Sequence, residues 1–143
     1  KAMSDAVKRF REFYEQQLGA GDLTQLSSVY SPAVIFQDPV ERLDGIDQLH
    51  RYFDRMMTNV SRCRFEISEL QQNSDQAFVI WQMYFAHPRL RRGKEICVDG
   101  STHLRFGDQI DYHRDYYDLG AMLYEQIPLL GSAVHAIKNR LQR

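Results

Sequence analysis

The sequence has few cysteines, no long apolar run and almost no net charge. Its 143 residues include two cysteines, 18 Lys and Arg, and 19 Asp and Glu, which gives a formal net charge of −1. A chain so close to neutral has no general electrostatic attraction to nucleic acid or to anionic membranes. Because two cysteines without CxxC spacing are too few for a disulfide framework, we expect reduced thiols in a cytoplasmic protein.

Several signals of membrane, metal or cofactor binding are also missing from the sequence. The first residues lack the apolar segment of a signal peptide, and no run of 18 or more apolar residues predicts a transmembrane helix. The five histidines are dispersed, and HExxH, Gly-rich phosphate loops and G-x-S-x-G do not occur. We therefore expect no metal and no cofactor, and neither nucleic acid nor a membrane as a partner.

Aromatic residues, in contrast, are plentiful. The chain has eight Phe, eight Tyr and one Trp, and its composition of 43% hydrophobic and 26% charged residues is typical of a folded protein. Its length predicts a single domain over residues 1–143. These aromatic residues exceed what a core of this size requires, so we expect some of the tyrosines to line a binding site.

The first part of the sequence predicts helices. Apolar residues at helical spacing indicate a helix that begins after the N-cap Ser4 and ends at Gly19-Ala20-Gly21. A short second helix is predicted from Asp22 to about Tyr30, where Ser31-Pro32 ends it. A third helix is expected to begin at Gly45.

Strands dominate the rest of the sequence. A strand ending at Asp38-Pro39 precedes the third helix. Four more with short connections, predicting an antiparallel meander, are Arg62–Leu70, Gln76–Ala86, Glu95–Phe106 and Ile110–Tyr117. The expected fold is α+β, with N-terminal helices on a curved, mostly antiparallel sheet. A last helical segment from Leu119 is predicted to be interrupted at Pro128 and Gly131.

Both faces of the predicted strand Gln76–Ala86 are largely apolar. Phe78 and Ile80 lie on one face, and Val79 and Trp81 on the other. Because the helices can cover only one face of the sheet, a second subunit or the C-terminal segment must cover the other. A homodimer is the simplest solution.

The strand Glu95–Phe106 alternates between two kinds of residue. Its even positions are apolar or small, so we expect them, including Thr102, to face inward. A two-residue type II′ turn at Gly107-Asp108 would pair Phe106 with Gln109 and place Thr102 opposite His113. The side chains that would then share the inner space with Thr102, as a substrate pocket, are Asp111, His113, Asp115 and Tyr117.

A three-residue turn would give the opposite arrangement. Ile110 would face inward, and His113 and Asp115 would be solvated or lie in an interface. This alternative buries Arg114, which would then need a carboxylate partner. With either turn, at least one ionisable group of this last strand lies inside.

The opening of the chain resembles that of ketosteroid isomerase, in which a tyrosine precedes a Leu-x-Ala-Gly-Asp-Leu turn. Residues Tyr14–Leu23 carry this pattern, and their spacing to Asp38-Pro39-Val40 also matches. From about Phe10 to Gly131 the chain resembles the nuclear transport factor 2-like superfamily, whose cone-shaped α+β fold is a cystatin-like roll. The resemblance implies that Tyr14 donates a hydrogen bond to a substrate oxyanion and that Asp38 shuttles the proton.

Other residues are more similar to the SnoaL-like branch of this superfamily. Thr102 takes the place of the protonated aspartic acid of the isomerase, so the third isomerase residue does not carry over. The run His-Arg-Asp-Tyr-Tyr-Asp at 113–118, followed by a helical segment, resembles the SnoaL-like branch. That branch contains cyclases, hydrolases and members of unknown activity, so the fold alone implies only a class.

Each candidate residue also has a purely structural interpretation. An Asp-Pro pair such as Asp38-Pro39 is ordinary turn chemistry, and Tyr14 could be a packing residue with a satisfied hydroxyl. His113 and Asp115 share one face of a strand about 6–7 Å apart, so they are either a base with its electrostatic partner or an ion pair that fixes the sheet. The basic hairpin 87–94 is a solvated loop or a contact for an anion or an acidic partner.

We therefore predict a dimeric protein that binds a small apolar or aromatic molecule, with cofactor-free isomerase, cyclase or hydrolase chemistry. In this hypothesis Asp38 is the base and Tyr14 an electrophilic donor. His113 and Asp115 polarise or protonate the substrate. The alternative is a non-catalytic ligand-binding or dimerisation module that serves a regulatory partner.

Overall fold

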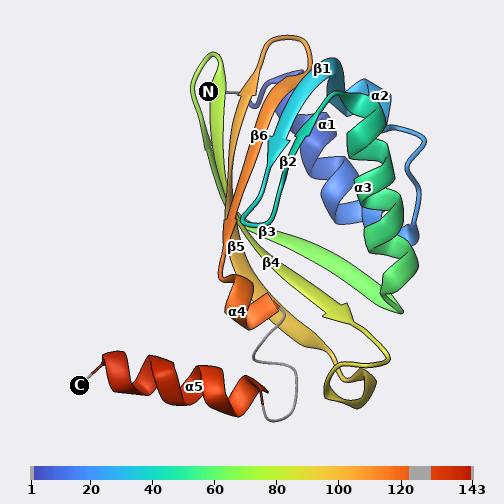
Figure 1. The fold of residues 1–143 in the computed structure, drawn as a ribbon. Coiled ribbons are helices and arrows are strands. Elements are labelled where there is room, and N and C mark those ends of the chain that lie inside the picture. Colours follow the sequence, from blue (N-terminus) through green and yellow to red (C-terminus); the bar gives the residue numbers. More distant parts are fainter. Residues whose placement is uncertain (1, 123–129, 143) are drawn as a thin grey trace.

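The computed structural model describes residues 2–122 and 130–142 and has the predicted α+β fold, with the helices of its N-terminal half on one face of a curved, open sheet (Figure 1). The helices are α1 (Asp5–Glu12), η1 (Phe13–Gln17), η2 (Leu18–Ala20), α2 (Leu26–Val29), α3 (Ile46–Asn59), η3 (Arg91–Gly93), α4 (Leu119–Met122) and α5 (Leu130–Leu141). The strands are β1 (Tyr30–Gln37), β2 (Arg42–Asp44), β3 (Arg62–Gln72), β4 (Gln76–Ala86), β5 (Ile96–Phe106) and β6 (Ile110–Tyr117).

The first helical segment begins and ends where the sequence predicts. The Ser4 hydroxyl accepts a hydrogen bond from the Val7 amide at 3.2 Å, which caps α1. The helix continues through the π-helical turn η1 and the 3₁₀ turn η2, and it stops at Gly21, which has a positive φ of 73°. Its apolar stripe, including Phe10 and Leu18, is buried.

The second helix is shorter than predicted, and the strand after it begins earlier. Only Leu26–Val29 is helical, and Ser31-Pro32 lies inside β1 rather than at the end of a helix. A proline is tolerated there because the pairing of β1 with β6 is irregular between Tyr30 and Ile35, so its missing N–H breaks no ladder. The short strand β2 was not predicted, because three residues carry no recognisable alternation.

The sheet has the strand order β2-β1-β6-β5-β4-β3. The predicted antiparallel meander over β3, β4, β5 and β6 is confirmed, whereas β1 pairs with β6 in parallel. Figure 1 shows α1 and α3 against the concave face of this curved sheet.

The β5–β6 connection differs from the predicted two-residue turn. Phe106 pairs with Ile110, so the connection has three residues (107–109), and Gly107 does not have a positive φ. The register then shifts by one more residue, Asp111, before Arg105 pairs with Tyr112. The longer turn and the β-bulge each exchange the inner and outer side chains of β6. Because both occur, the two exchanges cancel, and His113 and Asp115 face inward as predicted.

The corrected register moves the pairs along the strand but keeps most of the predicted inward residues. Thr102 lies opposite Asp115 rather than His113, and His113 lies opposite Leu104. His113 is completely buried, and Asp115 lies on the same side. The expectation that Asp111 faces inward is wrong, because the bulge leaves that residue exposed.

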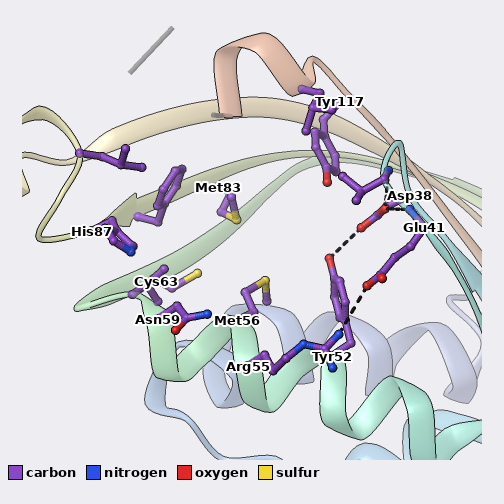
Figure 2. Close-up of a pocket in the computed structure, with 15 residues that line it drawn as sticks. Asp38, Glu41, Tyr52, Arg55, Met56, Asn59, Cys63, Met83, His87 and Tyr117 are labelled. Atoms are coloured by element: carbon purple, nitrogen blue, oxygen red, sulfur yellow. Dashed lines mark hydrogen bonds and ion pairs between the residues drawn. The ribbon is translucent and has the colours of Figure 1, made fainter. Parts of the chain in front are cut away.

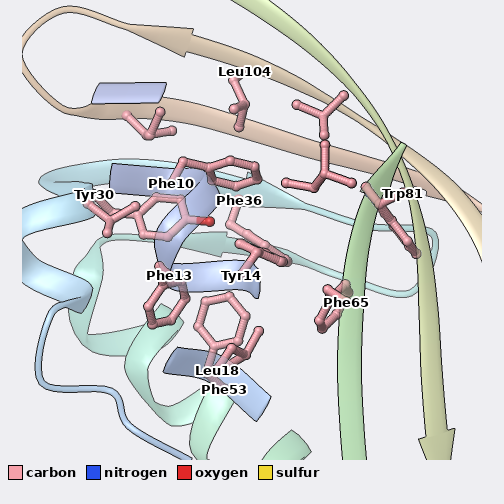
Figure 3. Close-up of a cluster of buried hydrophobic side chains, with 14 of the residues drawn as sticks. Phe10, Phe13, Tyr14, Leu18, Tyr30, Phe36, Phe53, Phe65, Trp81 and Leu104 are labelled. Atoms are coloured by element: carbon pink, nitrogen blue, oxygen red, sulfur yellow. The ribbon is translucent and has the colours of Figure 1, made fainter. Parts of the chain in front are cut away.

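The core fills the space between the helices and the concave face (Figure 3). Aromatic side chains from α1, η1, α3 and the sheet pack edge-on against one another, as Phe13 does with Phe53 at 5.7 Å between ring centroids. The even residues of β5 line this core, with Thr102 only 2% exposed. The outer face remains open, since Phe78 is 54% and Tyr116 48% exposed.

The C-terminal segment agrees only in part with its prediction. Leu119 does begin a helix, but Gly131 lies within α5 and does not interrupt it, while Pro128 lies outside the described residues. Lys138 of α5 forms an ion pair with Asp118 at 2.8 Å. In the described part of the chain, no helix is long and apolar enough to span a membrane.

Candidate functional site

A cavity of about 440 Å³ opens between α3, the ends of β3 and β4, and the start of α4 (Figure 2). Its middle is apolar and its polar groups lie toward the ends. It is lined by Asp38, Val40, Glu41, Tyr52, Arg55, Met56, Asn59, Val60, Cys63, Met83, Phe85, His87, Leu90, Tyr117 and Leu119. A volume of this size suits a small organic molecule.

Asp38 sits at one end of this cavity, immediately after β1. One carboxylate oxygen accepts hydrogen bonds from the backbone amides of Val40 (2.8 Å) and Glu41 (2.9 Å), which closes the Asp-Pro turn. The other oxygen accepts a hydrogen bond from the Tyr52 hydroxyl at 3.0 Å. Asp38 is therefore 7% exposed and surrounded by donors.

Behind the cavity, a buried network of polar side chains converges on Asp115. His113 Nε2 lies 2.6 Å from Asp115 Oδ1, and the same oxygen accepts the Thr102 hydroxyl at 2.6 Å. Trp81 donates its indole N–H to Thr102 at 2.8 Å. Among the described residues, none is a hydrogen-bond partner of the second oxygen, Asp115 Oδ2.

Two tyrosines hold the other side of His113. The Tyr30 hydroxyl lies 2.9 Å from His113 Nδ1, and the Tyr14 ring is stacked on the imidazole with 6.1 Å between ring centroids. Because a carboxylate only accepts hydrogen bonds, the hydrogen of the neutral imidazole is on Nε2, facing Asp115, and Nδ1 accepts the hydrogen of Tyr30. The chain of donors therefore runs from Tyr30 through His113 to Asp115.

A small void of about 30 Å³ separates this network from the larger cavity. Tyr14 and Asp115 line the void, and Tyr52 and Tyr117 line both spaces. Met56 and Met83 also line both spaces, so these four residues form the partition between them. Methionine changes rotamer readily, so this partition can yield to a ligand.

Burial keeps the phenols of the site protonated. Desolvation raises the pKa values of Tyr14, Tyr30 and Tyr52 well above their usual range, and the Asp115 charge raises them further. Desolvation and the charge of Asp38 raise the pKa of Tyr117 as well. All four tyrosines can therefore donate hydrogen bonds without losing a proton.

The cavity wall also contains a thiol, that of Cys63. Desolvation raises the pKa of Cys63 to about 12, so the thiol stays protonated near neutral pH and is a poor nucleophile. Cys63 and Cys97 are both free cysteines. Across residues 2–122 and 130–142, no group of three or more His, Cys, Asp or Glu is arranged to hold a metal ion.

The structure divides the predicted site residues between the large cavity and the inner void, while Asp38, Asp115 and Tyr117 also line a third cavity of about 240 Å³. Asp38 lines the large cavity, whereas Tyr14 lines only the inner void, so these two do not share a cavity. His113, Asp115 and Thr102 belong to the buried network. Tyr117 borders both spaces.

Sequence reasoning missed three residues of this site. Tyr30 and Tyr52 fall in predicted helices and Trp81 lies on an apolar strand face, positions that by themselves indicate only packing. Each contributes a polar hydrogen inside the core, to His113, to Asp38 and to Thr102 respectively. The available signal was chemical, since a buried phenol or indole needs a hydrogen-bond partner.

Comparisons with known proteins agree with this architecture. A family model described as the SnoaL-like domain matches residues 10–112. Among curated proteins, none matches the chain in sequence.

Solved structures share the fold at low sequence identity. An NTF2-like protein of unknown function from Burkholderia pseudomallei has a TM-score of 0.75 at 17% identity, over 88% of this chain and 99% of that chain. A candidate SnoaL-like polyketide cyclase from Jannaschia sp. CCS1 has a TM-score of 0.73 at 16% identity, over 90% and 98%. A Catenulispora acidiphila protein with a ketosteroid isomerase-like fold, in complex with trimethylamine, has a TM-score of 0.71 at 16% identity, over 89% and 96%.

Proposed function

Because the chain belongs to the SnoaL-like family of the nuclear transport factor 2-like superfamily, we propose that it binds a small apolar molecule and performs cofactor-free acid/base chemistry on it. The observation that carries this proposal is the unequal hydrogen bonding of the two carboxylate oxygens of Asp115. One of its oxygens is fixed by His113 and Thr102, while Oδ2 has no hydrogen-bond partner in the described chain. A carboxylate held in this way is oriented for proton transfer.

The proposed chemistry begins with removal of a proton from the carbon next to a substrate carbonyl. Asp115 Oδ2 takes the proton, and the electron pair of the C–H bond moves to the carbonyl oxygen. Tyr117 donates a hydrogen bond to that oxygen and stabilises its charge, since the one hydroxyl hydrogen of Tyr52 is already donated to Asp38. Return of the proton at another carbon completes an isomerisation. In a cyclisation the enolate carbon attacks a second carbonyl, and the oxygen of that carbonyl takes the proton back from Asp115 as a hydroxyl group.

Asp38 has a supporting role in this scheme. Its three donors occupy both oxygens, which leaves the carboxylate poorly available as a base. It holds Tyr52 at the boundary of the two spaces. We therefore propose Asp38 as a positioning residue and Asp115 as the proton-transfer group.

The proposed function is tested by binding followed by isotope exchange. We expect some members of a panel of apolar ketones and epoxides to raise the melting temperature of the protein, because a ligand of the folded state stabilises it. In D₂O, a bound ketone should exchange its α-hydrogens faster with the protein than without it, as seen by NMR. Binding without exchange or epoxide opening would contradict the enzymatic proposal.

One observation favours the non-catalytic alternative. The void between Asp115 and the large cavity is only about 30 Å³, so a ligand in the large cavity does not reach the carboxylate until the partition side chains move. A protein that binds its ligand in the outer cavity alone would show the stabilisation without the exchange. The same experiment therefore separates the two functions.

We also propose that the protein is a homodimer formed through the outer face of the sheet. Phe78 and Ile80 of β4 and Tyr116 of β6 are exposed on this face, and exposed apolar groups of this size are typical of interaction surfaces. Two copies related by a twofold axis would cover this face.

We expect Ile80→Glu to shift the protein from dimer to monomer in analytical ultracentrifugation. Ile137→Glu, an equally polar change at an exposed residue of α5, should leave the dimer intact, and a wild-type monomer would refute the assignment.

A further inference from the structure

The 440 Å³ cavity has ends of different chemical character. Figure 2 shows Asp38 and Glu41 at one end and His87 at the other. Glu41 is paired with Arg55, with 3.6 Å between their charged atoms. An anionic group of a ligand would be repelled by the Asp38 carboxylate, so the electrostatics of the cavity oppose placing such a group at the Asp38 end.

The opposite end is formed by the basic hairpin between β4 and β5. His87 and Leu90 of this hairpin line the cavity. Between them and just beyond them the sequence carries Arg89, Arg91, Arg92 and Lys94. Within the part of the chain that the structure describes, none of these four cations forms an ion pair.

The only acidic residue next to the hairpin does not neutralise it. Glu95 is 3.7 Å from Arg64 of β3, which engages its charge. The four cations therefore leave an excess of positive charge at this mouth of the cavity, although the whole chain has a formal net charge of −1. A cluster of positive charges at the mouth of a cavity attracts negatively charged ligands.

The backbone of the hairpin is held in an unusual conformation. Arg91, Arg92 and Gly93 all have positive φ values, of 46°, 57° and 78°. Residues other than glycine have a steric energy cost at positive φ. Such strained conformations are typically retained where the geometry of the loop serves a function. Hydrogen bonds from Gly93 to Leu90 and from Lys94 to Arg91 close the turn.

His87 supplies a neutral donor at the same end. Its Nδ1 accepts the backbone N–H of Arg89 at 3.0 Å, so in the neutral ring the hydrogen is on Nε2. Asn59 also lines this end of the cavity and carries an amide that can donate. Between the two ends the wall is apolar, with Met56 and Met83.

From this polarity we infer that the ligand is an amphipathic acid, an apolar body with one carboxylate held at the His87 end under the basic hairpin. This inference rests on the proposed function, because it names the substrate class of the same cavity. It also fixes the orientation of the ligand. The uncharged end, which carries the reacting carbonyl, points to Tyr52, Tyr117 and the void beside Asp115.

Two probes of nearly equal shape test the inference. Naphthalene-2-carboxylate and naphthalene-2-methanol differ in charge but little in size, and their binding is measured by isothermal titration calorimetry. At low ionic strength we expect the carboxylate to bind about tenfold tighter. This preference should shrink in 0.5 M NaCl, because salt screens the exposed cations.

Charge variants locate the source of the preference. In the variant Arg89→Gln/Arg91→Gln/Arg92→Gln we expect the two probes to bind about equally, with unchanged affinity for the alcohol. The variant Arg51→Gln/Arg62→Gln/Arg105→Gln removes the same charge from exposed positions outside the hairpin and should keep the preference.

The possible results separate the inference from the proposed function. Equal binding of the two probes to the wild type, or a preference that survives in the hairpin variant, overturns the inference while the cavity remains a binding site. If neither probe binds, the inference fails together with the proposed binding function. Loss of the preference in both charge variants also overturns it, because the net charge rather than the hairpin would then be responsible.

Discussion

Asp115→Asn should lower the turnover of any ketone substrate about 100- to 10,000-fold, the usual contribution of a general acid or base. The amide keeps the size of the carboxylate and can still accept hydrogen bonds from His113 and Thr102 through its oxygen. The fold and the affinity for ligand should therefore change little. Turnover is measured as α-hydrogen exchange, and folding as the midpoint of urea unfolding.

The matched control for this substitution lies on the same strand. Asp111 is the exposed residue of the β-bulge and touches neither cavity. Asp111→Asn removes the same charge from β6 and should leave turnover unchanged. Turnover that survives Asp115→Asn but disappears in Asp38→Asn would reverse the roles that we propose for the two carboxylates.

Gly100→Ala should lower the free energy of unfolding by about 2–3 kcal/mol, because overpacking and a lost hydrogen bond combine. A methyl group at this position would lie 2.2 Å from the ring of Trp81. The indole has to move, and its hydrogen bond to Thr102 breaks. Trp81 is the only tryptophan in the chain, so its fluorescence emission should shift to the red, and urea unfolding measures the loss of stability.

Gly107→Ala is the corresponding control at the end of β5. No atom lies within 4 Å of a methyl group built at Gly107, and its φ is not positive. We expect a change in the free energy of unfolding within about 0.5 kcal/mol, as for other open surface sites. If both alanine variants were equally stable, the close approach of Trp81 to Gly100 would not be a constraint on the sequence.

The sequence predicts the elements of this fold well because their signals are local. Ser4 caps α1 through its own neighbour Val7, and the alternation of β5 assigns Thr102 to the inner face correctly. The spacing of apolar residues likewise gives the position of α3. These features depend on residues only a few positions apart, so composition and periodicity are sufficient.

The details of the candidate site depend on contacts between distant residues. The bond between Tyr30 and His113 joins positions 83 residues apart, and that between Tyr52 and Asp38 joins a helix to a turn. The sequence indicated that His113 and Asp115 share a face, but it gave no signal for their partners. It also could not separate Tyr14 from Asp38, because the partition between their cavities is made by side chains from several elements.

The bulge at Asp111 means that a single residue decides which surface of β6 becomes the interior. Without it, the three-residue turn would direct Tyr112, Arg114 and Tyr116 into the cone and present His113 and Asp115 to the outside. The outer face of the sheet and the polar network of the core are thus two alternating halves of one short strand. Loss of one residue from the chain at this point would exchange the proposed dimer surface and the proposed reaction centre.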